Sequence, residues 1–219
     1  MFMNIPIRKV QRALSRKQES RLLKAIQEDL ASSLDSTKSQ ERNVDNLNQL
    51  IARNFALTGI EVEYAGPYGI LPGKELVSNP LFPDVAYLGS GPGCTDIDLH
   101  RGVIGTAIRN RASIYIPSVL DLEDQDPAAH HECRKPNEKR RDMSEIVIAV
   151  PKITFDGRVA IQETYDLDLR VPRAFSDEGA IEFEGIIVPA MRICFPEKVI
   201  TYNPIEGLHV RPSPAYQHD

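Results

Sequence analysis

The stretch SEIVIAVPKITFDGRVAIQETYDLDL, residues 144–169, decides the fold class that we expect for this chain. Near its start, Ile146 and Ile148 recur at the period of two that is typical of a strand with one buried face. Asp156-Gly157 follows and is the strongest short hairpin signal in the sequence. The residues after this turn alternate again, so the stretch predicts two antiparallel strands joined by a tight turn.

Hydrophobic periodicity predicts further elements on both sides of this hairpin. The predicted helices are Lys17–Leu34, Gln40–Leu57, Gly102–Arg111 and Ser176–Cys194. The predicted strands are residues 60–64, Val85–Leu88, Thr95–Leu99, Ser113–Val119, Ser144–Thr154 and Arg158–Leu169. This order predicts an α+β fold, in which helices pack on one face of an antiparallel sheet and an N-terminal helical extension precedes it.

The segments between these elements carry turn residues or long polar runs. We expect the chain to turn at Pro67, Gly69, Pro72 and Gly73, because both residue types favour turns. Leu120–Asp142 is predicted to be a long loop, and so long a polar segment in a compact domain is usually functional or disordered. The tail after Phe195 is rich in proline and is expected to be irregular. We therefore divide the chain into a basic arm and helix at 1–39, a domain at 40–195 and an irregular tail at 196–219.

The composition indicates a globular protein. Of the 219 residues, 42% are hydrophobic and 26% are charged, which excludes wholesale disorder and a fibrous class. No apolar run is long enough to span a bilayer and the start carries no secretory signal, so we expect a cytoplasmic protein without a membrane partner. The net charge of −5 argues against bulk nucleic-acid binding, and the basic side chains of residues 1–17 are interpreted as a solvated arm.

The two N-terminal helices are predicted to be amphipathic. Leu22 and Ile26 share one face of the first helix, and Val44 and Leu47 share one face of the second. These faces could pack on the sheet or pair with a second subunit. Because two such helices offer more apolar surface than one small sheet is expected to cover, we expect a homodimer through residues 17–57.

Several segments, taken together and in order, resemble the GAF domain family. They are Gly102–Ala107, Ile114–Val119, Ser144–Val147, Val150-Pro151, Asp156-Gly157, Asp166–Asp168 and Ala174–Glu178. The resemblance covers roughly residues 40–195. It implies a GAF-like sheet and a small ligand bound in a pocket between that sheet and a lid of loops and short helices.

One branch of this family, the free methionine-(R)-sulfoxide reductases, is similar at further positions. The stretch Tyr64-Ala65-Gly66-Pro67-Tyr68 resembles an aromatic stretch of that branch, so Tyr64 and Tyr68 are implied to bind substrate. Glu145, Asp166 and Asp168 match its substrate-binding acids. The resemblance places Cys133 where the branch carries its reactive cysteine, and Cys94 at the matching distance before Gly102.

Sulfoxide reduction needs a thiolate that attacks sulfur and a proton for the departing oxygen. Cys133 would be the nucleophile, because the basic side chains beside it favour the thiolate. Cys94 would resolve the resulting sulfenic acid, and a thioredoxin-type reductant would then restore both thiols. Glu145 would hold the proton, while Asp166 and Asp168, which alternation puts on one face of a strand, would grip the ammonium of a free amino acid. No bound cofactor is expected.

Less specific interpretations of the same residues stay open. Asp166 and Asp168 also fit a solvated sheet edge, and Cys133 fits a passive thiol on a loop. Zinc is not expected, because His130, His131 and Cys133 have no second ligand pair. Cys194 lies on an apolar helical face and is interpreted as a core residue.

Two other functions compete with the reductase. The first is a GAF sensor that binds a small metabolite or nucleotide without catalysis and signals through its helices; the second is an interaction module that uses the N-terminal helices. Ile104 stands where the reductase branch usually has another cysteine, and Tyr64 stands where it usually has tryptophan. These two differences favour the sensor, whereas Cys94 together with Cys133 favours the enzyme.

Overall fold

A five-stranded antiparallel sheet forms the centre of the molecule. The structure is a computed structural model, and it describes residues 13–70, 85–87, 102–121, 143–153, 159–196, 198–203 and 207–212. The sheet order is β2-β1-β5-β4-β3. Its strands are β1 (Val62–Ile70), β2 (Val85–Tyr87), β3 (Ile114–Ile116), β4 (Ser144–Ile153) and β5 (Val159–Leu169). β4 and β5, the two strands of the predicted hairpin, pair along their length from Ser144 opposite Leu169 to Ile153 opposite Val159.

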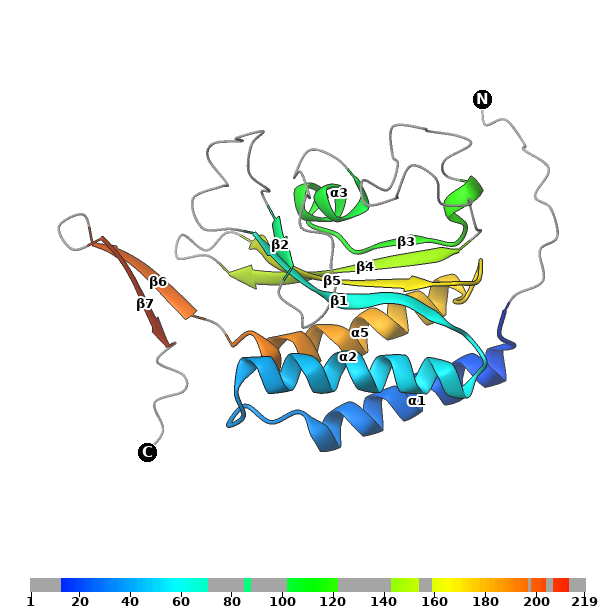
Figure 1. Ribbon diagram of the computed structural model, residues 1–219. Coiled ribbons are helices and arrows are strands. Elements are labelled where there is room, and N and C mark those ends of the chain that lie inside the picture. The colour runs from blue at the N-terminus through cyan, green and yellow to red at the C-terminus, as the bar shows by residue number, and fades with distance from the viewer. Residues whose placement is uncertain are drawn as a thin grey trace, which may run out of the picture.

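Helices lie on both faces of this sheet (Figure 1). Three long helices, α1 (Arg16–Ser33), α2 (Gln40–Leu57) and α5 (Asp177–Cys194), cover one face. The shorter helix α3 (Gly102–Asn110) lies over the other face and contacts β4 and β5. The sheet is therefore buried from both sides, and the central strands β5 and β4 carry two different sets of buried side chains.

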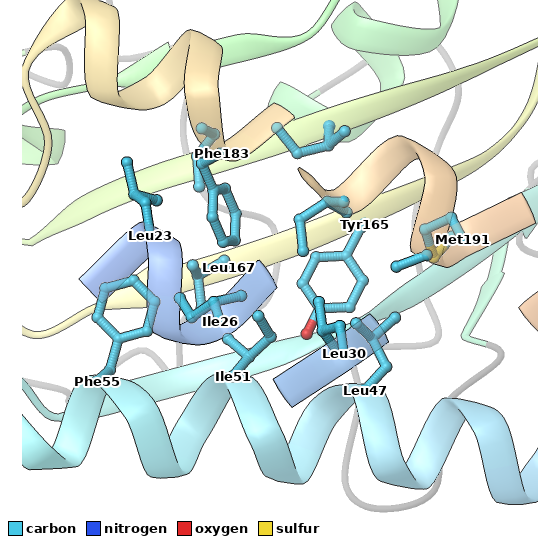
Figure 2. Packing of buried hydrophobic residues seen from close by; sticks show 14 of the residues in the cluster. Leu23, Ile26, Leu30, Leu47, Ile51, Phe55, Tyr165, Leu167, Phe183 and Met191 are labelled. Carbon is cyan, nitrogen blue, oxygen red and sulfur yellow. The ribbon is translucent and has the colours of Figure 1, made fainter. Parts of the chain in front are cut away.

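The main hydrophobic core lies between the three long helices and the sheet. Figure 2 shows apolar side chains of α1, α2 and α5 meeting Tyr165 and Leu167 of β5. Phe55 of α2 packs edge-on against Phe183 of α5, with ring centroids 6.4 Å apart. The fully buried members include Leu23, Ile26, Leu47, Ile51, Phe55, Ile148, Tyr165, Leu167, Phe183, Ile187 and Met191. Helix α1 thus belongs to the same packed body as the sheet.

Serine side chains fix where the three long helices begin. The hydroxyl oxygens of Ser15, Ser39 and Ser176 each accept a hydrogen bond from a backbone N–H in the first turn of the helix that follows. Such caps satisfy amide groups that have no partner inside the helix. At Ser15 the cap is reciprocal, because the side chain of Gln18 accepts from the backbone N–H of Ser15.

Most of the predicted elements are confirmed to within a few residues. The predicted helices correspond to α1, α2, α3 and α5, and the predicted hairpin to β4 and β5. The strand predicted over Ser113–Val119 is shorter and ends at Ile116, because proline follows it. The turn at Pro72-Gly73, Thr95–Leu99, most of Leu120–Asp142 and the turn at Asp156-Gly157 lie outside the described residues.

Two expectations about local structure are wrong. The chain does not turn at Pro67 and Gly69, since β1 continues through both to Ile70. Among the described residues, β2 pairs with Tyr68–Ile70 and no strand pairs with β1 on that side at Pro67, and strands tolerate proline at such edges. The tail is not wholly irregular either, because β6 (Lys198–Asn203) and β7 (Gly207–Pro212) form a two-stranded antiparallel sheet.

The apolar faces of α1 and α2 pack within the chain. Leu22, Ile26, Val44 and Leu47, on which the expected homodimer was based, are all buried in the main core. The homodimer and the division of the chain at residues 39 and 195 stay predictions. Within the described residues, no helix is both long and apolar enough to cross a membrane.

Candidate functional site

The strand β5 separates two environments because its side chains alternate between the faces of the sheet. Tyr165, Leu167 and Leu169 point into the core beneath the long helices. Thr164, Asp166 and Asp168 therefore point to the opposite face. That face lies under α3, and it is the one that carries the candidate functional site.

Three acidic side chains meet on this face. Glu145 of β4 stands directly opposite Asp168 of β5, and Asp166 occupies the next position of β5 on the same face. One carboxylate oxygen from each residue lies within 4.8 Å of those of the other two. All three residues are buried, with at most 5% of their surface exposed. The structure thus brings together the three acids that the sequence predicted, and it contradicts the alternative that they form a solvated sheet edge.

This arrangement favours a cation. Like charges buried at such short distances repel one another strongly, because the surrounding protein screens them less than water does. A bound ammonium group, a metal ion or a proton would each relieve that repulsion. Carboxylate oxygens are also the ligands that hard divalent cations prefer. The sequence signal for such an ion is a Glu on one strand opposite an Asp-x-Asp on the next, which differs from the histidine and cysteine spacing of zinc sites.

Two tyrosines converge beside the acids. Tyr64 and Tyr68 lie four residues apart on β1, which in a strand separates their Cα atoms by about 13 Å. Their ring centroids are nevertheless only 5.7 Å apart. The residue between them on this face is Gly66, which has no side chain to keep the rings apart. Gly66 stands directly opposite Asp166, so the two rings flank the position next to the acidic cluster.

Apolar side chains of α3 close this region from above. Ile104 and Ala107 of α3 pack with Tyr68 and Val147 in a second, smaller cluster that is separate from the main core. The helix begins at Gly102, whose φ of +64° lies in the left-handed region that glycine adopts without strain. The acids therefore lie on a strand face beneath an apolar cover. Such surroundings strengthen the electrostatic attraction between the carboxylates and a bound cation.

The cysteines separate into two groups. Cys94 and Cys133, the predicted catalytic pair, lie outside the described residues, as do His130 and His131. Cys194 is fully buried on α5, as expected for a core residue. Burial raises the pKa of its thiol to about 12, so at neutral pH it is not a thiolate.

No family model and no curated protein sequence matches the chain. Among solved structures, a GAF domain superposes with a TM-score of 0.54 and 20% identity, over 83% of this chain and 92% of that one. The fold is that of a GAF domain.

Two further GAF-type structures resemble this chain to a similar degree. A GAF sensor protein from Burkholderia vietnamiensis, itself assigned only provisionally, superposes with a TM-score of 0.51 and 20% identity, over 84% of this chain and 92% of that one. The free methionine-R-sulfoxide reductase from Neisseria meningitidis, solved with its substrate, gives 0.50 and 20% over 84% and 96%. At this identity the comparisons establish the GAF fold and not the activity.

Proposed function

We propose that this GAF-fold protein binds a small amino-acid-like molecule through the carboxylates of Glu145, Asp166 and Asp168. The observation that carries the proposal is the burial of all three acids within 4.8 Å of one another beneath an apolar cover. Buried carboxylates repel an anion. A cationic group that binds beside them lowers the free energy of the site, because it relieves the repulsion among the three carboxylates. The ammonium group of a free amino acid has the required charge and hydrogen-bond donors.

The specific reaction that we propose is the thiol-dependent reduction of free methionine-(R)-sulfoxide. Asp166 and Asp168 would hold the ammonium group, and Tyr64 and Tyr68 would contact the apolar part of the substrate. Glu145 would carry the proton that the sulfoxide oxygen receives. The strand register supports this division, because Glu145 comes from β4 whereas the two aspartates come from β5.

The reaction balances with two thiols from this chain and one external dithiol. The Cys133 thiolate attacks the sulfoxide sulfur and forms an S–S bond, while protons from Glu145 and from solvent allow the sulfoxide oxygen to leave as water. A water molecule then attacks the Cys133 sulfur, the S–S bond breaks, methionine leaves with its electron pair, and Cys133 becomes a sulfenic acid. The Cys94 thiol then attacks that sulfenic acid, which forms a disulfide and releases water. A thioredoxin-type dithiol reduces the disulfide and is itself oxidised. A reducing cytoplasm and a homodimer are parts of the same proposal.

The proposal is tested by thioredoxin-coupled turnover of free methionine-(R)-sulfoxide. Wild-type protein is expected to consume substrate, and Cys133→Ser is expected to stop turnover. Glu145→Gln is expected to lower kcat more than it raises KM, because the loss falls in the transition state. Glu182→Gln removes an exposed acid from α5 and serves as the matched control, with unchanged rates. Absence of turnover by wild-type protein would contradict the reductase.

A sensor is the second candidate, and one contact favours it. Tyr165, which lies between Thr164 and Asp166 on β5, donates a hydrogen bond from its hydroxyl to Oδ1 of Asn48 on α2, at 3.1 Å. A ligand that moves the acidic end of β5 would therefore also act on α2. The sensor predicts that small cationic or zwitterionic metabolites stabilise the protein thermally without turnover, and that Asp166→Asn abolishes this stabilisation.

A further inference from the structure

The helix α5 carries a stripe of apolar residues on its solvent-exposed side. Ile181 is 68% exposed, and within the described part of the chain Leu57 is the only other large hydrophobic residue that is so exposed. Gly185 and Pro189 follow Ile181 at intervals of four residues and are exposed as well. Residues four apart lie on the same side of a helix, so these three form one apolar stripe on α5. Exposed apolar patches on a folded domain are typical of surfaces that bind another protein.

Gly185 lies at the centre of this stripe, and its surroundings within the chain do not require a glycine. A Cβ atom added there would meet no other atom within 4 Å, and its φ is not in the left-handed region. Glycine is nevertheless one of the weakest helix formers. The close approach of a second helix backbone does require a residue without a side chain at the crossing point.

The two ends of the stripe carry opposite charges. Glu178 lies seven positions before Gly185 in the first turn of α5, and Arg192 lies seven positions after it in the last turn. Both side chains are exposed, and Glu178 accepts a hydrogen bond from Arg16 through Oε2 at 2.8 Å. Fourteen residues of helix separate Glu178 from Arg192 by about 21 Å, so the two do not contact each other within one chain.

This arrangement of residues about Gly185 is self-complementary. If the α5 helices of two copies pack antiparallel around a two-fold axis at Gly185, each Glu178 comes to the level of the partner's Arg192. Ile181 comes to the level of the partner's Pro189 in the same way. The symmetry produces each contact twice, so both charged ends and both apolar segments find a complementary surface.

We propose that α5 forms the interface of a homodimer, in which the α5 helices of two copies cross antiparallel at Gly185. The inference rests on the proposed function only for the homodimer itself, and it specifies the surface that forms it. The apolar faces of α1 and α2 are not available for this contact, because they are buried in the core of their own chain. The interface therefore lies on α5 and not on residues 17–57.

Charge reversal on α5 tests the contact between Glu178 and the partner's Arg192. Glu178→Arg and Arg192→Glu each bring like charges together at both ends of the crossing, and each variant alone is expected to weaken dimerisation about tenfold or more in sedimentation equilibrium. An equimolar mixture of the two variants is expected to restore dimers, because every charged contact in the mixed dimer again joins a carboxylate and a guanidinium. Glu41→Arg is the matched control, since Glu41 is also an exposed acid in the first turn of a long helix, and it is expected to dimerise like wild type.

The change Gly185→Ala distinguishes an interface from a local role of the glycine. Within one chain the added methyl group meets no atom and alanine is favoured in a helix, so dilute, monomeric protein is expected to melt at the same or a higher temperature. In the dimer the same methyl group crowds the crossing point, so the Kd of dimerisation is expected to rise about tenfold or more. A lower melting temperature with unchanged dimerisation would refute the inference and would show that glycine serves the helix itself, which contains Pro189.

Assembly is measured without ligand, so the possible failures can be told apart. If wild-type protein sediments as a monomer at high concentration, the inference and the homodimer are both refuted, and the acidic site is untouched. If wild type is a dimer that the charge reversals do not weaken, or if the mixture does not restore dimers, the α5 interface is refuted and the homodimer stands. Absence of turnover by a dimer that responds as expected would contradict the reductase and support the α5 interface.

Discussion

A buried carboxylate on α1 joins the N-terminal helix to the start of α5. Glu19 is 5% exposed and accepts hydrogen bonds from the backbone N–H of Ser176 at 2.6 Å and from its hydroxyl at 2.9 Å. The Ser176 oxygen in turn accepts from the N–H of Gly179 at 3.0 Å. A carboxylate is favourable at this place, because the first turn of a helix carries partial positive charge. We predict that Glu19→Ala strongly destabilises the fold.

The size of the effect follows from these contacts. Hydrogen bonds to a charged group contribute about 1.5–3 kcal/mol each, and an amide left buried without a partner costs about 1–3 kcal/mol. These contributions overlap, so Glu19→Ala is expected to cost about 3 kcal/mol in the free energy of unfolding. For a protein of this size each kcal/mol shifts the melting temperature by about 2–4 °C, which gives a fall of about 6–12 °C.

Gly179 provides the sharper test. A Cβ atom added at Gly179 would overlap the Oε1 atom of Glu19, which its bonds to Ser176 hold in place. Gly179→Ala is therefore expected to destabilise wild-type protein. In the Glu19→Ala background the overlap is gone, and alanine is favoured over glycine in a helix by up to about 1 kcal/mol, so the same change is expected to stabilise. Denaturant titrations of the four proteins measure this double-mutant cycle, and an equal effect in both backgrounds would refute the reasoning.

Three other predictions concern thiols, alkali and assembly. Cys133 is expected to be alkylated before Cys194, whose buried thiol has a pKa raised to about 12; peptide mass mapping that shows faster labelling of Cys194 would contradict this. Burial also raises the pKa of Tyr115 to about 12, whereas an unfolded tyrosine has a pKa of about 10. The stability that depends on the neutral phenol is therefore fully present below about pH 10 and is lost as the pH rises toward 12. Tyr115→Phe is expected to lose less stability than wild type across that range in denaturation at successive pH values, and an equal loss would refute the assignment. Sedimentation is expected to show the proposed homodimer, and a monomer at high concentration would contradict it.

The sequence predicted the fold well where local signals agreed with the final packing. Ile146 and Ile148 alternate in the sequence and face the long helices in the structure. The alternation failed to show that Val147 is buried too, because α3 covers the second face of the sheet and nothing local reveals that cover. The prediction of a turn at Pro67 was wrong. Whether β1 can contain a proline at this position depends on how far β2 extends beside it, and the local sequence does not show this.

The candidate site was predictable in part. Alternation alone put Asp166 and Asp168 on one face, and the hairpin register brought Glu145 opposite Asp168. The convergence of Tyr64 and Tyr68 was not predictable, because it depends on the missing side chain of Gly66 and on the spatial approach of two rings.

The structural role of Glu19 was not predictable from the sequence. The contact between Glu19 and Ser176 joins residues 157 positions apart in the chain, and no local pattern links them.

The central claim is that the buried carboxylates hold the cationic end of a small ligand. The most direct measurement is a calorimetric titration of Cys133→Ser protein with free methionine-(R)-sulfoxide, with and without the added change Asp168→Asn. Removing one charged partner from a buried, hydrogen-bonded pair typically costs about 2–5 kcal/mol, so Asp168→Asn is expected to weaken binding by well over tenfold with the fold intact. Equal affinity with and without Asp168→Asn, or no binding to either protein, would contradict the account.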